Sequence, residues 1–127
     1  YKMKQFIDST IIIGAFTPNE KKEVCQNTLR EGGVINGLVL IESFDVIERI
    51  TKNREYALKV IKSLMSSDLE VIELTKGFIF EAMKRSDKYD LRIFDLIHYT
   101  SALLNGCSAI VSYDNHFDNL EIKRAEP

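Results

Sequence analysis

Short apolar runs alternate with longer segments of helical periodicity along this chain. The apolar runs have the length of buried strands and lie at residues 4–7, 34–35, 69–74 and 109–111, and a last strand can be placed at 120–123. Between them, apolar residues recur three and four positions apart. This spacing predicts helices at residues 11–16, between an Asn19 cap and a Gly32-Gly33 stop, at 37–51, 53–65 and 75–86, and around Asp95. Each of the first three strands is therefore followed by two helices.

This order predicts the fold class. Strands separated by helices pair in parallel, and a parallel sheet needs helices on both of its faces. We therefore expect an α/β fold with three α/β/α layers around a central parallel sheet of four to five strands. The chain has no internal repeat or linker-like segment, and 127 residues suffice for one core but not for two ordinary domains. A single domain over residues 1–127 is expected.

Composition narrows the setting in which the chain works. It is 45% apolar and 28% charged, no apolar run approaches the roughly 18 residues of a membrane span, and no secretory leader is apparent. Cys25 and Cys107 lie far apart in the sequence without a CxxC spacing, so we expect two buried, reduced thiols rather than a disulfide or a zinc site. A cytoplasmic protein with no membrane partner is expected.

The charge balance restricts how the chain can meet a nucleic acid. The net charge is −2 and the isoelectric point is near 5.7. These values exclude binding through a broad basic surface. Any contact with nucleic acid must therefore use a local site.

Four acidic residues stand where a solvated surface charge is not expected. Asp8 and Asp114 each follow the carboxyl end of a predicted strand, Asp95 lies among apolar residues of a helix, and Glu42 falls on the inward face of another helix. Ligands of open α/β sheets bind in the crevice beyond the carboxyl ends of the strands, so these acids can converge there. Taken singly, each acid would more often be a turn, cap or surface residue. The combination indicates a site.

Converging carboxylates need a compensating charge. Two unit charges about 4 Å apart repel by about 4 kcal/mol at an effective dielectric constant near 20. A divalent cation offsets this repulsion, and hard oxygen ligands favour Mg²⁺ or Mn²⁺ over zinc. Such an ion supports chemistry at phosphate groups, because it generates a hydroxide-like nucleophile and neutralises phosphate oxygens.

Three segments of the chain carry a family resemblance. They are, in chain order, FIDST at residues 6–10, LVLIESFDVI at 38–47 and RIFDLIHYTSALLNGCSAIVSYDNHF at 92–117. Together they resemble the PIN domain, and most closely the VapC-type toxin ribonucleases of toxin–antitoxin pairs. The resemblance covers nearly the whole chain, and its first and last segments are the most specific.

The resemblance implies a function and a set of site residues. It implies a Mg²⁺- or Mn²⁺-dependent endoribonuclease with an RNA substrate, a homodimeric assembly and an antitoxin whose tail covers the site. The positions that match the acidic site of the family are Asp8, Glu42, Asp95 and Asp114. We expect the three aspartates to hold the metal and Glu42 to assist, with Ser112 and Thr10 in supporting positions.

Two positions depart from the family pattern. His116 stands where many relatives carry another acid, and Thr10 stands where they often have Asn. Asp118 is close enough in sequence to replace the missing acid, but we expect a surface role for it. His98 and His116 have no partners at metal-ligand spacing, so we expect packing or surface roles for both. An imidazole next to an acidic site can nevertheless approach a phosphate.

Two other classes of α/β protein fit the same residues poorly. A haloacid-dehalogenase-like phosphatase needs a second acid where this chain has Thr10, and a receiver domain needs acids that are absent after the first and third strands, where only Glu73 is near. Two alternatives within the PIN fold stay open. They are an RNA-processing nuclease outside a toxin–antitoxin pair, and a non-catalytic module that binds RNA or protein.

Overall fold

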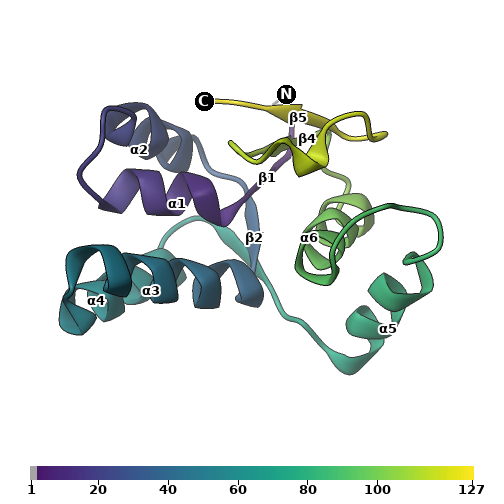
Figure 1. Cartoon of the computed structure of the whole chain (residues 1–127), viewed down its shortest axis with the longest axis horizontal. Helices are drawn as coiled ribbons and strands as arrows, with labels where there is room; N and C mark the ends of the chain where they lie inside the picture. The colour runs from purple at the N-terminus through teal and green to yellow at the C-terminus, as the bar shows by residue number, and fades with distance from the viewer. Residues whose placement is uncertain (1–2) are drawn as a thin grey trace.

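The computed structural model describes residues 3–127, and its centre is a five-stranded sheet (Figure 1). The strands are β1 (Gln5–Ile7), β2 (Val34–Asn36), β3 (Glu70–Ile72), β4 (Ala109–Val111) and β5 (Lys123–Ala125). Their order across the sheet is β3-β2-β1-β4-β5, and every pairing is parallel. Parallel pairing confirms the expected sheet.

Six α-helices flank this sheet. They are α1 (Ser9–Phe16), α2 (Lys22–Glu31), α3 (Gly37–Thr51), α4 (Arg54–Met65), α5 (Lys76–Lys84) and α6 (Ile93–Leu104). Helices α1 to α4 lie on one side of the sheet, and α5 and α6 lie on the other (Figure 1). This arrangement confirms the three-layer α/β/α fold class and the predicted order of elements.

The two central strands lie in the middle of the hydrophobic core. Phe6 and Ile7 of β1 and Ile110 of β4 are fully buried, and Val111 is nearly so. They belong to one cluster of buried side chains that also includes Leu96 on α6. Because both faces of these strands are covered, the residues that follow them are held in a rigid, largely dry environment.

Some predicted boundaries are wrong, for identifiable reasons. Helix α2 begins at Lys22, not at an Asn19 cap, because the Asn19 side chain closes a turn in which its Oδ1 accepts from Lys21 N at 2.8 Å. The last strand lies at residues 123–125 rather than 120–123. Ile122 is buried, and its backbone N–H donates to the Tyr99 hydroxyl at 3.0 Å, so that N–H is used outside the ladder.

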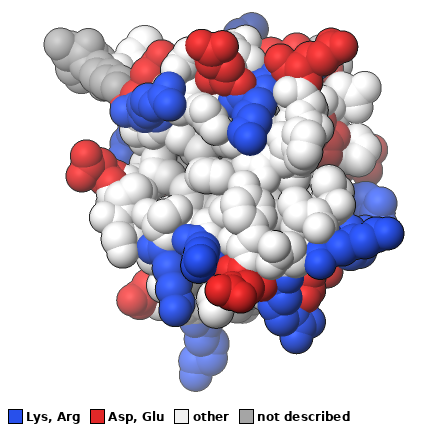
Figure 2. All heavy atoms as spheres, turned by 90° about the vertical axis from the view of Figure 1, so that its left-hand side faces the viewer, with Lys and Arg blue, Asp and Glu red and all other residues white. Residues whose placement is uncertain are grey.

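The distribution of charged side chains on one face of the molecule bears on the broad basic surface that the net charge argues against. On the face formed by α1 to α4, acidic and basic side chains surround a central area without charged residues (Figure 2). This face therefore offers no continuous basic surface. Within residues 3–127, no helix is both long and apolar enough to cross a membrane.

Candidate functional site

Pairing of the two central strands brings the two ends of the chain together. Ile7 at the end of β1 is in register with Val111 at the end of β4, and Asp8 N donates to Val111 O at 3.0 Å. Asp8 and Ser112 therefore leave the sheet side by side, at its carboxyl edge. Asp114 follows two residues later, at the start of the 3₁₀ helix η1 (Asn115–Phe117).

Two hydroxyl groups hold Asp8. This side chain is only 5% exposed, and its Oδ2 accepts from Ser112 Oγ at 2.7 Å and from Thr10 Oγ1 at 3.0 Å. Each hydroxyl oxygen also accepts a backbone N–H: Asp114 N lies 2.9 Å from Ser112 Oγ, and Tyr113 N lies 3.1 Å from Thr10 Oγ1. Hydrogen bonds to an ionised carboxylate are among the stronger ones in proteins. Ser112 and Thr10 thus fix Asp8 and, at the same time, the loop that carries Asp114.

A second group joins the start of α6 to η1. His116 Nδ1 lies 3.1 Å from Asp95 Oδ2 and 3.1 Å from Asp114 Oδ1. Asp114 Oδ1 also caps η1 by accepting from His116 N at 2.9 Å. Burial raises the pKa of the Asp95 carboxyl; the hydrogen bond with His116 opposes this rise, and the negative charge of Asp114 adds to it. The imidazole therefore lies between two carboxylates that would otherwise repel each other.

A third contact crosses between the two helical layers. His98 on α6 is 1% exposed, and its Nε2 lies 2.7 Å from Oε1 of Glu42 on α3. Asn36, at the end of β2, lies on the other side of the same ring, with Nδ2 3.2 Å from His98 Nδ1. Glu42 is thus held by a buried residue, while its own side chain is 27% exposed.

These contacts meet around one hollow of about 330 Å³. It is lined by Glu42, Asp95, Asp114 and His116, together with Arg92, Ile93 and Phe94. Asp8 does not line this hollow, but Ser112 links it to Asp114, and its carboxylate lies within 4.8 Å of ligand atoms of Glu42 and His98. Three of the four acids therefore share a hollow, and the fourth is buried next to it.

The free oxygens of these acids suit a cation. Each carboxylate has one oxygen in a hydrogen bond or ion pair and one without such a partner among residues 3–127. The oxygens without a partner are Asp8 Oδ1, Glu42 Oε2, Asp95 Oδ1 and Asp114 Oδ2. Carboxylate oxygens with waters are the usual ligands of Mg²⁺ and Mn²⁺. The donor set therefore fits a divalent ion.

Both histidines have the expected burial or exposure, but they also make contacts that sequence spacing did not predict. His98 is buried as expected for a packing role, but it also contacts Glu42, 56 positions away. His116 is exposed, yet it contacts Asp95 and Asp114. Asp118 instead accepts from Arg124 Nε at 2.7 Å, so its expected surface role is confirmed. The position of His116 two residues after Asp114 was the one sequence signal that could have placed it at the site.

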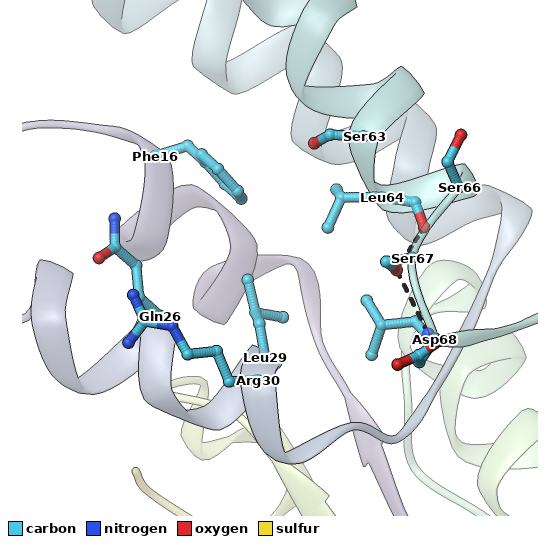
Figure 3. A pocket seen from close by; sticks show the side chains of 10 residues that line it. Phe16, Gln26, Leu29, Arg30, Ser63, Leu64, Ser66, Ser67 and Asp68 are labelled. Carbon is cyan, nitrogen blue, oxygen red and sulfur yellow. Dashed lines mark hydrogen bonds between the residues drawn. The ribbon is translucent and has the colours of Figure 1, made fainter.

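A larger hollow, of about 660 Å³, lies between α2 and the end of α4 (Figure 3). Phe16, Leu29 and Leu64 point into it, and Arg30 and Asp68 lie at its edge (Figure 3). It shares no lining residue with the smaller hollow lined by Glu42, Asp95 and Asp114, which we call the acidic hollow. Because no two acids converge there, the candidate chemistry belongs to the acidic hollow.

The fold and its acidic edge define an α/β protein with a carboxylate site at the ends of its central strands. The PIN domain model matches residues 6–123, and the chain belongs to the PIN domain family. No curated protein matches its sequence.

Three solved structures are similar in fold. VapC20 of Mycobacterium tuberculosis, a sarcin–ricin loop cleaving toxin, has a TM-score of 0.77 at 15% identity, with 98% of this chain and 100% of that chain covered. A toxin–antitoxin complex from Klebsiella pneumoniae gives 0.71 at 13% identity, covering 94% and 95%. VapBC2 from Rickettsia felis, bound to a DNA fragment from its promoter, gives 0.70 at 16% identity, covering 98% of each chain.

Proposed function

We propose that this protein is a metal-dependent endoribonuclease that hydrolyses phosphodiester bonds of RNA. The observation that carries the proposal is the convergence of Glu42, Asp95 and Asp114 on one hollow, with Asp8 buried next to it. Buried or half-buried carboxylates repel each other and are costly to maintain without a compensating ligand. The PIN domain family supplies the class of reaction.

The side chains of the site have different proposed roles in metal binding and proton transfer. Asp8, Asp95 and Asp114 would hold Mg²⁺ or Mn²⁺, with Ser112 and Thr10 fixing the orientation of Asp8. When bound, such an ion lowers the pKa of a coordinated water and neutralises phosphate oxygens. Glu42 accepts a proton from the attacking water, because it faces the hollow with one oxygen free.

Arg92 is suited to bind the RNA backbone. It lines the acidic hollow, and no ion pair of it is found among residues 3–127. A guanidinium group binds phosphate with two parallel hydrogen bonds. One such cation beside the acids is consistent with a chain whose net charge is −2.

We further propose that the protein is the toxin of a toxin–antitoxin pair and acts in the cytoplasm. Support comes from the similar folds of VapC20, a toxin that cleaves the sarcin–ricin loop, and of proteins solved as toxin–antitoxin complexes. An antitoxin would bind this chain and cover the acidic hollow. Co-expression with the product of an adjacent small reading frame tests this: the toxin assignment requires a stable complex in which RNA cleavage is suppressed.

A homodimer is proposed from the exposed apolar side chains. Ile79, Phe80 and Met83 on α5 and Ile93 and Phe94 at the start of α6 are 39–62% exposed. Helices α5 and α6 are in contact with each other. Exposed apolar side chains that gather in one region are typical of an interface between protein chains.

The nuclease proposal is tested with the purified full chain and single-stranded or stem-loop RNA. Cleavage is expected with Mg²⁺ or Mn²⁺ and not with excess chelator. Asp8→Asn and Asp114→Asn should lose cleavage while keeping the fold, as judged by circular dichroism. Asp45→Asn is the matched control, because Asp45 is an exposed acid paired with Arg49 on α3. Cleavage that persists in chelator or in Asp8→Asn contradicts the mechanism, and RNA binding without cleavage indicates a binding module.

A further inference from the structure

A buried chain of polar side chains runs from the start of α3 to the acidic hollow. Asn36 and Ser101 are fully buried and His98 is 1% exposed. Asn36 Nδ2 lies 2.9 Å from Ser101 Oγ and 3.2 Å from His98 Nδ1, and His98 Nε2 lies 2.7 Å from Glu42 Oε1. Because buried polar groups are nearly always paired, each hydrogen atom in this row of side chains can be assigned to a donor and an acceptor.

The assignment begins at the amino end of α3. Asn36 is the N-cap of this helix, and its Oδ1 accepts from Val39 N at 2.9 Å. A backbone N–H can only donate, so the oxygen of the Asn36 amide must face Val39. The amide nitrogen, which can only donate, therefore faces Ser101 and His98.

Ser101 accepts the first of the two hydrogens of the Asn36 amide. Its hydroxyl donates to Ile97 O at 2.9 Å, one turn earlier on α6, so its oxygen is an acceptor for Asn36. The second hydrogen of the Asn36 amide points to His98 Nδ1. A proton on Nδ1 would oppose this hydrogen, so Nδ1 carries a lone pair and the ring carries its proton on Nε2.

We infer that His98 is a positioning residue, which donates its Nε2–H to Glu42 and fixes this carboxylate for the reaction. The inference rests on the proposed function of the site. It also decides between two roles for His98. Ligand atoms of Asp8, Glu42 and His98 lie within 4.8 Å of one another, which suits a metal triad. To coordinate a metal through Nε2, the neutral ring would have to carry its proton on Nδ1, where it would oppose the Asn36 amide. His98 therefore orients Glu42 instead.

The two oxygens of Glu42 therefore have different roles. Oε1 accepts the hydrogen bond from His98, while no hydrogen bond to Oε2 is found among residues 3–127. Because His98 is held by Asn36, and Asn36 by the helix start, the Glu42 carboxylate cannot rotate freely. Its second oxygen is thus kept available for a water molecule in the hollow.

The tautomer is read directly by nuclear magnetic resonance of the metal-free full chain with ¹⁵N-labelled histidine. The chain has two histidines, and a His116→Gln sample assigns the signals of His98. A protonated Nε2 and an unprotonated Nδ1 are expected, and addition of Mg²⁺ should leave this pattern in place. A proton on Nδ1, or loss of the Nε2 proton when Mg²⁺ is added, overturns the inference. This measurement does not depend on cleavage activity.

Kinetics test the positioning role. His98→Leu should lower kcat by about 10- to 100-fold, as is typical when a residue that orients an active group is removed, with KM little changed. His98→Gln keeps an N–H donor and should recover most of kcat. In a Glu42→Gln background, His98→Leu should have no further effect, since the residue acts through Glu42. Equal losses in both backgrounds would show a purely structural role and refute the inference.

Two further variants guard against loss of folding. Asn36→Asp presents only acceptors to the ring, so Nδ1 should become protonated although His98 and Glu42 are intact. Ser101→Ala is the matched control, because it removes one partner of Asn36 and leaves the tautomer unchanged. An Nδ1 that stays unprotonated in Asn36→Asp contradicts the inference. If the wild-type chain cleaves no RNA, the proposed function fails, and the resonance experiment still decides the tautomer.

Discussion

Ser112 Oγ lies 2.7 Å from Asp8 Oδ2, although 104 positions separate the two residues. The same oxygen accepts the backbone N–H of Asp114 at 2.9 Å. A single buried hydroxyl therefore connects an acid from the first strand with an acid from the fourth. Its hydrogen bond also holds the most buried carboxylate of the site in place.

Removal of this hydroxyl should weaken the fold and the site together. Ser112→Ala leaves the buried Asp8 with one donor fewer, which should lower the free energy of unfolding by about 1–3 kcal/mol. Urea denaturation of the metal-free protein measures the change. Ser43→Ala is the control, because Ser43 Oγ is buried without a hydrogen-bond partner in the described chain and its loss should cost little. Equal effects of the two substitutions would contradict a special role for Ser112.

The clustered acids should make the metal-free wild type less stable than a variant in which one of them is neutral. Burial raises the pKa of Asp95, so at neutral pH its ionised form destabilises the folded state. Asp95→Asn removes this charge and should raise the melting temperature in chelator. The contact of His116 with Asp95 and Asp114 offsets part of the repulsion and limits the gain.

Addition of Mg²⁺ should then reverse or narrow the ranking of these two proteins. At ten times the dissociation constant, binding adds about 1.4 kcal/mol to the wild type, or about 4–7 °C in melting temperature for a domain of this size. Asp95→Asn should gain little from the same ion. If both proteins respond alike, and the variant is the less stable one in chelator, Asp95 is not part of a metal site.

Arg92 should contribute to binding of RNA rather than to chemistry. Arg92→Ala removes a cation that lines the acidic hollow, so KM should rise by up to about tenfold with kcat little changed. The slope of log affinity against log salt should fall by about one, as expected for one phosphate contact. Arg49→Ala is the control, since Arg49 is paired with Asp45 and does not line the hollow. Equal changes in both variants would exclude a specific phosphate contact.

Cys107 should make stability fall in alkaline solution. Burial raises the pKa of its thiol to about 11, whereas an unfolded cysteine has a pKa of about 8.5. Between these values the thiol ionises in the unfolded chain but not in the folded one. The free energy of unfolding should therefore be unaffected below about pH 8.5 and fall above it, by at most about 1.4 kcal/mol per pH unit from this group. Urea denaturation at pH 8 and pH 10 should show a smaller loss in Cys107→Ala than in the wild type.

The exposed apolar residues of α5 should mediate self-association. Phe80 is 62% exposed, and Phe80→Asp would place a charge in the proposed interface. Sedimentation at micromolar concentration should show a dimer for the wild type and a shift toward monomer for this variant. Leu58→Asp, on α4, is the control, because Leu58 is an apolar residue that is 44% exposed and lies outside the proposed interface. A monomeric wild type would contradict the proposed homodimer.

The fold was predictable because its signals are local. Short apolar runs such as residues 109–111 are typical of strands that are buried on both faces. The segments between these runs have helical periodicity, and strands connected by helices pair in parallel. The four acids were also singled out by local signals, since each stands beside apolar sequence, at a strand end or on an inward helical face. The structure then places three of them on one hollow.

The remaining features depend on contacts that sequence spacing does not encode. Glu42 and His98 are 56 positions apart, and the role of His98 follows from the orientation of the Asn36 amide. That orientation is fixed in turn by a backbone N–H at the start of α3. Likewise, Asn19 is as good a cap as Asn36 by residue type, yet it closes a turn instead. Only the three-dimensional arrangement distinguishes the two.

The adjacency of β1 and β4 determines when the protein can first act during its synthesis. The two strands pair at positions 104 residues apart, so the sheet cannot close around its centre until residues 109–111 have left the ribosome. A nascent chain that ends before residue 109 has Asp8, Glu42 and Asp95 but neither the strand nor the loop that brings the fourth acid to them. A chain that terminates before β4 should therefore be inert, and the proposed activity has to wait until the segment from β4 to η1 has been synthesised.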